Sequence, residues 1–187
     1  MKEVIFSTGN AIKYMTASQA CEKYGIKLIQ QQVEIDEIQA EDAEKIAMDK
    51  ATKAYALIKK PVVVSDDSWA FLGLMGFPGP YMSSINHWFT PEDFLRLTAS
   101  LTDRSVILTQ YIVYQNKDVQ KVFTAQSKGE LLKEIRGTSV HPNHTIITMS
   151  GDNGSSIAEV YKSGADTSNR IVAKLWNEFA QWYSKNP

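Results

Sequence analysis

The sequence predicts an α/β protein. Apolar stretches typical of buried strands alternate with helical segments in the first part of the chain, several strand-like segments follow, and a helix closes the chain. Such alternation is typical of folds in which helices cover a sheet. The 187 residues suffice for one domain with a full core and are few for two independent domains, so we expect a single domain over residues 1–187.

In the first part of the chain, apolar spacing and terminating residues define each predicted element. The helix after the first strand stops at Gly25, a residue type common just after helix ends. The next helix has an apolar stripe at helical spacing, acids in its first turn and Lys59-Lys60-Pro61 at its end. In order, we expect a strand at 4–7, a helix at 11–24, an extended segment at 26–35, a helix at 41–58 and a strand at 61–65 that runs into Asp66 and Asp67.

In the second part, a loop rich in glycine and proline at 74–81 precedes a helix start at 90–93. Thr90 is the expected cap of that helix, and Pro91 takes its first position. Alternating apolar residues then predict a long hairpin. In order, we expect hairpin strands at 105–115 and 119–127, further strands at 130–135 and 144–149, a loop at 150–156 and a final helix at 168–184.

Composition excludes several classes of protein. Charged residues make up 22% of the chain, apolar residues 43%, and the net charge is -1, which indicates neither a nucleic-acid-coating surface nor a disordered chain. The single cysteine, Cys21, excludes an intrachain disulfide and a multi-cysteine zinc site. We find no signal-peptide pattern and no apolar run near the roughly 18 residues that cross a bilayer. We therefore expect a soluble, cytoplasmic protein that binds neither nucleic acid nor membrane.

The stretch FSTGNAIKY, residues 6–14, joins a strand to a helix start. Thr8, Gly9 and Asn10 offer backbone N–H groups and polar side chains at the positive end of a helix dipole, and Lys13 lies one turn into the helix. Such a junction can bind phosphate. Threonine and asparagine are also ordinary helix caps, and for this stretch alone capping is the favoured interpretation.

A second candidate is VVVSDDSWAF, residues 62–71, in which Asp66 and Asp67 follow a buried strand. The carboxyl ends of strands are where open α/β sheets keep their sites. Adjacent strand residues point to opposite faces, so we expect one acid to face a ligand and the other its support. A carboxylate there could hold Mg²⁺ or take a proton from water. Acids also lead strands into turns, and from this stretch alone the two interpretations are about equal.

Four motifs in order span nearly the whole chain. They are T-G-N-x-x-K at 8–13, K-A-x-x-A at 50–54, D-D-S at 66–68 with G-F-P-G-P-Y at 76–81, and S-N-R-x-x-A at 168–173. Supporting stretches are EIQ at 37–39, KGELLKEIRG at 128–137 and the pair Ala158-Glu159. Together they resemble the inosine triphosphate pyrophosphatase family, whose members remove deaminated purine nucleotides from the precursor pool.

The resemblance implies a fold, an assembly and a reaction. The expected fold is a long, bent, mixed β-sheet with flanking helices that form two lobes around a central cleft, and the expected assembly is a homodimer. The expected reaction is Mg²⁺-dependent hydrolysis of a nucleoside triphosphate of the inosine or xanthosine class to the monophosphate and pyrophosphate.

The match also assigns roles to single residues. Asp67 would be the general base and a metal ligand, and Glu44 would be the second metal ligand. Arg170 would correspond to an arginine that helps to recognise the base. The expected substrate contacts are Thr8, Asn10, Lys13, Ser68, Lys162, Asn169 and Arg170.

Some positions near the expected metal depart from the family pattern. Trp69 stands where the family commonly has glycine, beside the expected catalytic acid. The family's metal-binding glutamate lies five positions before the lysine matched by Lys50, and Lys45 occupies that position here. Glu44, next to it, serves only if the helix start shifts by one residue.

The base-recognition segment departs further. SVHPNHTII at 139–147 replaces a Phe-Gly-Tyr/Trp-Asp-Pro segment, with His144 at the aspartate position and Asn143 at the aromatic one. Asn169 replaces a histidine of the family, and Lys162 is displaced by two positions from a family lysine. Histidine cannot replace an acid that accepts from a purine N–H without changing the donor and acceptor pattern, so we expect altered base specificity.

Two alternatives to an active enzyme remain open. A catalytically silent relative would bind a nucleotide or a protein partner through the same cleft. A protein that keeps only the scaffold would have an interaction or structural role. The scaffold alternative is disfavoured because residues far apart in the chain match the family motifs together, namely Thr8, Asn10, Lys13, Asp67 and Arg170.

Overall fold

The computed structural model of the protein describes residues 1–164 and 171–186. The strands in this part of the chain are β1 (Lys2–Phe6), β2 (Ile26–Gln30), β3 (Val62–Phe71), β4 (Pro78–Gly79), β5 (Ser105–Gln115), β6 (Gln120–Leu131) and β7 (Ile147–Met149). They form one sheet in the order β2-β1-β3-β5-β6-β7, with β4 paired to β3. β1 pairs in parallel with β2 and β3, whereas β3 pairs antiparallel with β4 and β6 with β7. The expected α/β class and mixed sheet are confirmed.

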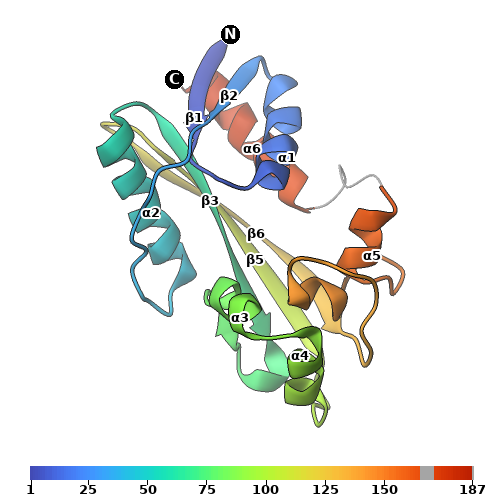
Figure 1. The fold of residues 1–187 in the computed structure, drawn as a ribbon. Helices are drawn as coiled ribbons and strands as arrows, with labels where there is room; N and C mark the ends of the chain where they lie inside the picture. Colours follow the sequence, from blue (N-terminus) through green and yellow to red (C-terminus); the bar gives the residue numbers. More distant parts are fainter. Residues whose placement is uncertain (165–170, 187) are drawn as a thin grey trace. The chain divides into compact units, whose positions relative to one another are not determined.

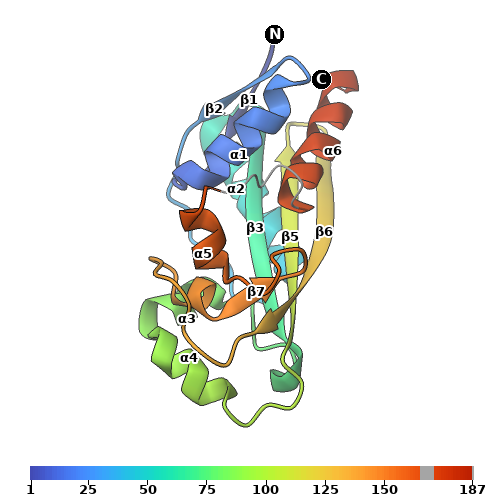
Figure 2. The same cartoon turned by 90° about the vertical axis from the view of Figure 1, so that its right-hand side faces the viewer.

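Helices flank this sheet, as Figures 1 and 2 show. They are α1 (Ala11–Glu22), α2 (Ala43–Ile58), α3 (Met82–Trp88), α4 (Pro91–Thr98), α5 (Ile157–Lys162) and α6 (Ile171–Lys185), with 3-10 turns at Leu72–Leu74 and Pro142–Thr145. Within the described ranges, no helix has the length and apolar character needed to cross a membrane.

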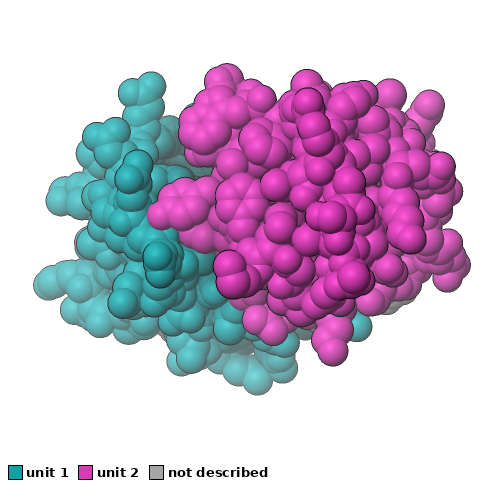
Figure 3. Space-filling view, turned by 90° about the horizontal axis from the view of Figure 1, so that it is seen from below, with its two compact units in different colours: residues 1–66, 110–125, 167–187 teal, residues 67–109, 126–166 magenta. Residues whose placement is uncertain are grey.

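The chain divides into two compact units, coloured teal and magenta in Figure 3. Unit 1 takes its described residues from 1–66, 110–125 and 167–187, and unit 2 consists of 67–109 and the described part of 126–166. The chain first passes from one unit to the other inside β3, between the two adjacent aspartates, and does so again inside β5 and β6. The single domain and the central cleft expected from the sequence stay predictions.

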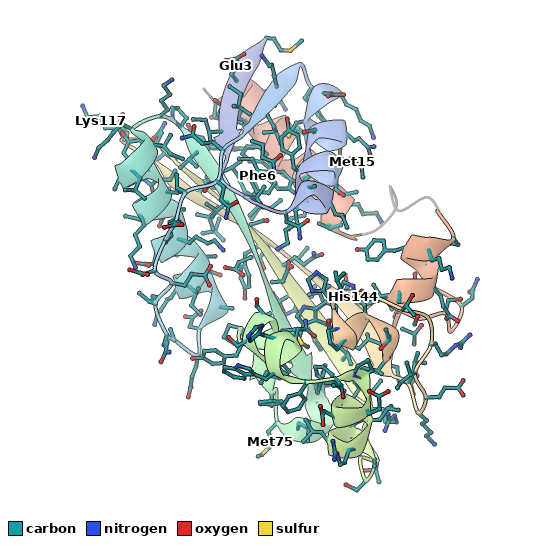
Figure 4. The ribbon with its side chains drawn as sticks, in the orientation of Figure 1. Glu3, Phe6, Met15, Met75, Lys117 and His144 are labelled. Atoms are coloured by element: carbon teal, nitrogen blue, oxygen red, sulfur yellow. The ribbon has the colours of Figure 1, made fainter. Side chains whose placement is uncertain are left out.

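In unit 1, the two faces of the strands carry different helices. Alternate residues such as Val4, Phe6 and Val63 pack against α1 and α6, and Phe6 lies 4.8 Å from Trp176 between ring centroids (Figure 4). The intervening residues, such as Val64, pack against the alanine-rich face of α2. This alternation follows from the two-residue period of a strand, and it places α2 on the face from which Asp66 projects.

Unit 2 has a core of its own, built on Trp69 and Phe71 of β3 and on residues of α3, α4 and β7. The predicted cap of α4 is confirmed: Thr90 and Asp93 exchange hydrogen bonds in a capping box, and Pro91 takes the first position.

Two supporting stretches of the resemblance contact each other in unit 2. Arg136 Nε lies 3.3 Å from Glu159 Oε2, and the Ser156 hydroxyl donates to the Arg136 carbonyl at 2.7 Å. Gly137 has φ +75°, and a Cβ there would lie 3.2 Å from both Ala158 Cβ and Glu159 Cγ. Glycine is therefore required where the chain passes the first turn of α5.

The structure differs from the predicted elements in several places. Of the strand predicted at 144–149, only Ile147–Met149 forms a strand, because residues 144 and 145 belong to the 3-10 turn Pro142–Thr145. β3 does not end at the two aspartates but continues to Phe71, because β4 pairs with it at Trp69 and Ala70. β6 extends to Leu131 and absorbs the start of the strand predicted at 130–135. The short helices α3 and α5 were not predicted, since segments of seven and six residues give little periodicity. Residues 168–170 of the predicted last helix lie outside the described residues.

Candidate functional site

The turn between β1 and α1 caps the helix. Asn10 Oδ1 accepts hydrogen bonds from the N–H groups of Ile12 at 2.9 Å and Lys13 at 3.0 Å. Thr8 Oγ1 accepts from the Asn10 N–H at 3.1 Å, and Gln30 Nε2 donates to the Thr8 carbonyl at 3.1 Å. The capping interpretation is therefore confirmed, and the two side chains fix the shape of the turn.

Capping leaves other donors of this turn for a ligand. Within the described part of the chain, no residue accepts a hydrogen bond from the N–H groups of Gly9 and Ala11. The side chain of Gln32 lies against Gly9, where a Cβ would be 2.5 Å from Gln32 Oε1. These donors lie at the positive end of the α1 dipole, where an anion is stabilised.

Asp66 is held by a lysine. Lys50 Nζ lies 3.4 Å from Asp66 Oδ2 and 2.6 Å from Glu37 Oε1, so one ammonium group joins two carboxylates within unit 1. Burial alone would lower the pKa of Lys50, but the charge of Asp66 and the hydrogen bond and charge of Glu37 outweigh it and raise that pKa. Lys50 therefore stays charged and neutralises part of the negative charge of Asp66 and Glu37.

Asp67 and Ser68 follow Asp66 in β3, and both are half-buried. Because successive strand residues project to opposite faces, Asp67 leaves the strand on the face opposite to Asp66, and Ser68 on the same face as Asp66. The contacts of Asp66 fit the supporting role that the sequence predicts for one acid of the pair. The assignment of Asp67 as the acid that faces a ligand stays a prediction.

Glu44 and Lys45 lie in the first turn of α2. The Glu44 N–H donates to Oδ1 of the N-cap residue Asp42 at 3.0 Å. Burial, and then the charges of Glu44 and Asp42, raise the pKa of Tyr111 in β5. Lys45 Nζ lies 3.7 Å from Asp42 Oδ2, and both side chains are exposed. The assignment of Glu44 to a metal stays a prediction.

Glu37 is an acid that sequence reasoning did not place in the site. It belongs to the segment 31–42 between β2 and α2, and it shares Lys50 with Asp66. The sequence signal that points to it is the EIQ stretch at 37–39.

The donors near Lys50 fit Mg²⁺ in their chemistry. Glu37 and Asp66 supply carboxylate oxygens, the ligands that Mg²⁺ prefers, and both already surround one positive charge. Within residues 1–164 and 171–186, no group of three or more histidine, cysteine, aspartate or glutamate side chains gathers that could hold a metal ion.

An aromatic cluster surrounds His144 in unit 2, and Figure 4 labels this residue. Its ring centroid lies 5.0 Å from that of His141, 5.8 Å from that of Tyr161 and 6.4 Å from that of Trp69. Its Nδ1 lies 3.5 Å from Ser139 Oγ. Trp69 is buried, so it supports the cluster from the core, whereas Tyr161 is nearly half exposed.

Asn143, at the aromatic position of the family segment, is structural. It is buried, its Oδ1 accepts from Asn86 Nδ2 at 2.9 Å, and its N–H donates to Asn86 Oδ1 at 3.1 Å. The amide therefore fixes the 3-10 turn to α3 and is unavailable for stacking on a base.

The remaining predicted contacts are Lys162, in the last turn of α5, and two residues that follow it in the sequence. Lys162 is exposed in that turn. Asn169 and Arg170 lie outside the described residues, so their roles stay predictions.

Comparison with known proteins agrees with this fold. The Ham1 family model matches residues 4–176. A dITP/XTP pyrophosphatase of Methanopyrus kandleri is 29% identical over 187 residues, which cover 98% of this chain and 97% of that protein. An inosine triphosphate pyrophosphatase 2 of Trypanosoma cruzi is 29% identical over 136 residues, 72% of this chain and 69% of that protein.

Solved structures share this fold. A HAM1 protein from Coxiella burnetii superposes with a TM-score of 0.77 and 18% identity, covering 99% of this chain and 98% of its own. The likeness shows the fold, and the family match extends over most of the sequence. The chain therefore belongs to the Ham1 family.

Proposed function

We propose that the protein is a Mg²⁺-dependent nucleoside triphosphate pyrophosphatase that converts deaminated purine nucleoside triphosphates to monophosphates and pyrophosphate, a house-cleaning role. The observation that carries the proposal is the acid pair of β3, in which Lys50 and Glu37 support Asp66 while Asp67 projects to the other face. The substrate class is supported by the relatives, which are named as dITP/XTP and inosine triphosphate pyrophosphatases.

The triphosphate would bind at the start of α1. The N–H groups of Gly9 and Ala11, the Asn10 side-chain amide and the Lys13 ammonium are donors suited to phosphate oxygens. Thr8 contributes by fixing the turn through its hydrogen bond with the Asn10 N–H. Ser68, Lys162, Asn169 and Arg170 are the further predicted contacts of the nucleotide.

Asp67 would act as the general base. It accepts a proton from a water molecule as the water oxygen bonds to the α-phosphorus, and the bond from that phosphorus to the bridging oxygen breaks. Pyrophosphate leaves with the electron pair, and Lys13 stabilises its charge. Of the carboxylates that contact Lys50, Glu37 would hold Mg²⁺, and Asp67 and Glu44 are the metal ligands that the family resemblance implies. When bound, the ion neutralises charge on the phosphates.

The two candidate glutamates can be separated by a matched pair of variants. We expect Glu37→Gln to raise the Mg²⁺ concentration needed for half-maximal activity by about 10-fold or more, since the loss of a metal ligand weakens the site at least as much as the loss of a supporting residue. We expect a much smaller change for Glu44→Gln. The measurement is pyrophosphate release against Mg²⁺ concentration, and the reverse order would assign the metal to Glu44.

The base preference is tested with a panel of standard and deaminated nucleoside triphosphates, with and without Mg²⁺. Because an aspartate accepts from a purine N–H whereas a histidine N–H donates, we expect His144→Asp to shift kcat/KM toward inosine and xanthosine triphosphates by about 10-fold. An unchanged ratio would remove His144 from base recognition. Saturable binding without pyrophosphate release in the unmodified protein would instead favour the catalytically silent alternative.

Assembly and location follow the family in this proposal. We expect a homodimer in a cytoplasmic setting, without nucleic acid or membrane as a partner.

A further inference from the structure

Few of the residues in the segment that carries Glu37 pack against the core. Residues 31–42 join β2 to α2 without regular secondary structure. Val33 and Ile35 pack against the core on the α2 side of unit 1, whereas most other residues of the segment are exposed. A glutamate on such a segment needs its backbone fixed, because an unfixed backbone loses conformational entropy when the side chain binds a ligand.

Two lysines of α2 hold this segment. Lys50 Nζ donates to Glu37 Oε1 at 2.6 Å, and Lys53 Nζ donates to the carbonyl oxygen of Asp36 at 2.7 Å. Residues three positions apart lie on the same face of a helix, so both ammonium groups reach the same side of α2. Lys50 therefore contacts the side chain of Glu37, and Lys53 contacts the peptide group that precedes Glu37.

An ion pair with Asp49 orients the side chain of Lys53. Its Nζ lies 2.8 Å from Asp49 Oδ2, one turn earlier in α2. The pair is only partly exposed, and an ion pair one turn apart on a helix surface contributes little to stability. What distinguishes Lys53 is its second contact, since a hydrogen bond to a main-chain carbonyl fixes the backbone whatever rotamer Glu37 adopts.

We propose that Lys53 is a positioning residue of the metal site: it holds the Asp36 carbonyl and so places the Glu37 carboxylate for Mg²⁺. Lys53 touches neither substrate nor metal in this role. The inference rests on the proposed function, because it takes Glu37 as a metal ligand.

The test compares Lys53→Met, which removes the ammonium and keeps an apolar stem, with Lys53→Arg and with Lys27→Met. Lys27 pairs with Glu3 at 3.1 Å on the surface of unit 1, so its loss controls for removing a paired lysine. Binding of Mn²⁺, a divalent ion that takes the same oxygen ligands, is measured by electron paramagnetic resonance. We expect Lys53→Met to weaken binding by about 10-fold, Lys53→Arg to restore most of it, and Lys27→Met to leave it unchanged.

A second readout needs no metal. A protease that cleaves after glutamate has sites at Glu34, Glu37 and Glu41 in this segment. We expect cleavage there to be several-fold faster in Lys53→Met than in the unmodified protein or in Lys27→Met. A residue with only a general structural role would lower thermal stability without this local change.

The outcomes separate the two proposals. Mn²⁺ affinity in Lys53→Met equal to that of the unmodified protein, with or without faster cleavage, overturns the positioning role and leaves the proposed function intact. Absence of Mn²⁺ binding and of turnover in the unmodified protein overturns both.

Discussion

Asp67→Asn lowers turnover by about 10²–10⁴-fold, the usual contribution of a general base, while a nucleoside triphosphate still binds. Asparagine keeps the shape of the side chain but cannot accept the proton of the attacking water, and it is a poorer ligand for Mg²⁺. Half-buried Asp67 projects from β3 away from the Lys50 ion pair, so the substitution leaves that pair in place. Pyrophosphate release measures turnover, and equilibrium binding of a non-hydrolysable analogue measures affinity.

Two further variants test whether the loss of turnover is specific to Asp67. Asp118→Asn, in the exposed turn between β5 and β6, removes an equivalent charge from unit 1 and should leave turnover unchanged. Asp66→Asn weakens the contact with Lys50 and should lower turnover less than Asp67→Asn, because it disturbs the support of the site. Full activity in Asp67→Asn would remove the residue from the reaction, and a larger loss in Asp66→Asn would exchange the two roles.

The sequence could predict most of the elements because their signals are local. The cap at Thr90, the stop at Gly25 and the stripe of α2 each depend on residues within a few positions of one another. The turn at 8–13 shows both the value and the limit of such signals. Its capping residues and its predicted phosphate contacts are the same side chains, and local spacing cannot separate the two roles.

Features that depend on tertiary contacts could not be predicted. β3 continues past Asp67 because β4 pairs with it, and the pairing depends on a turn that brings Pro78 back to Ala70. Glu37 shares a lysine with Asp66 only because α2 folds against β3 and places Lys50 between the two carboxylates. No periodicity marks Glu37, since its segment is neither helix nor strand.

The largest expected effect on stability lies in unit 2, at Arg104. Its guanidinium is buried and donates to three main-chain carbonyls: those of Leu131 and Thr98, each at 2.8 Å, and that of Leu132 at 2.5 Å. It thereby ties the end of α4 to the end of β6. Arg104→Met fills similar space but removes a donor from all three carbonyls, of which that of Thr98 also accepts from the Leu101 N–H at 3.2 Å, so we expect a loss of about 3 kcal/mol or more in the free energy of unfolding. Urea unfolding, combined with hydrogen exchange at the Leu131 and Leu132 amides, measures the loss and locates it.

Arg96→Met is the matched control, because Arg96 pairs with Asp93 on the exposed surface of α4 in the same unit. Surface pairs contribute little, so this variant should unfold close to the unmodified protein. Equal effects of the two variants would mean that the three carbonyls find other donors, such as water, when Arg104 is lost. A large loss confined to Arg104→Met would show that one buried cation, whose partners among the described residues are main-chain carbonyls, holds the strand and helix ends of unit 2 together.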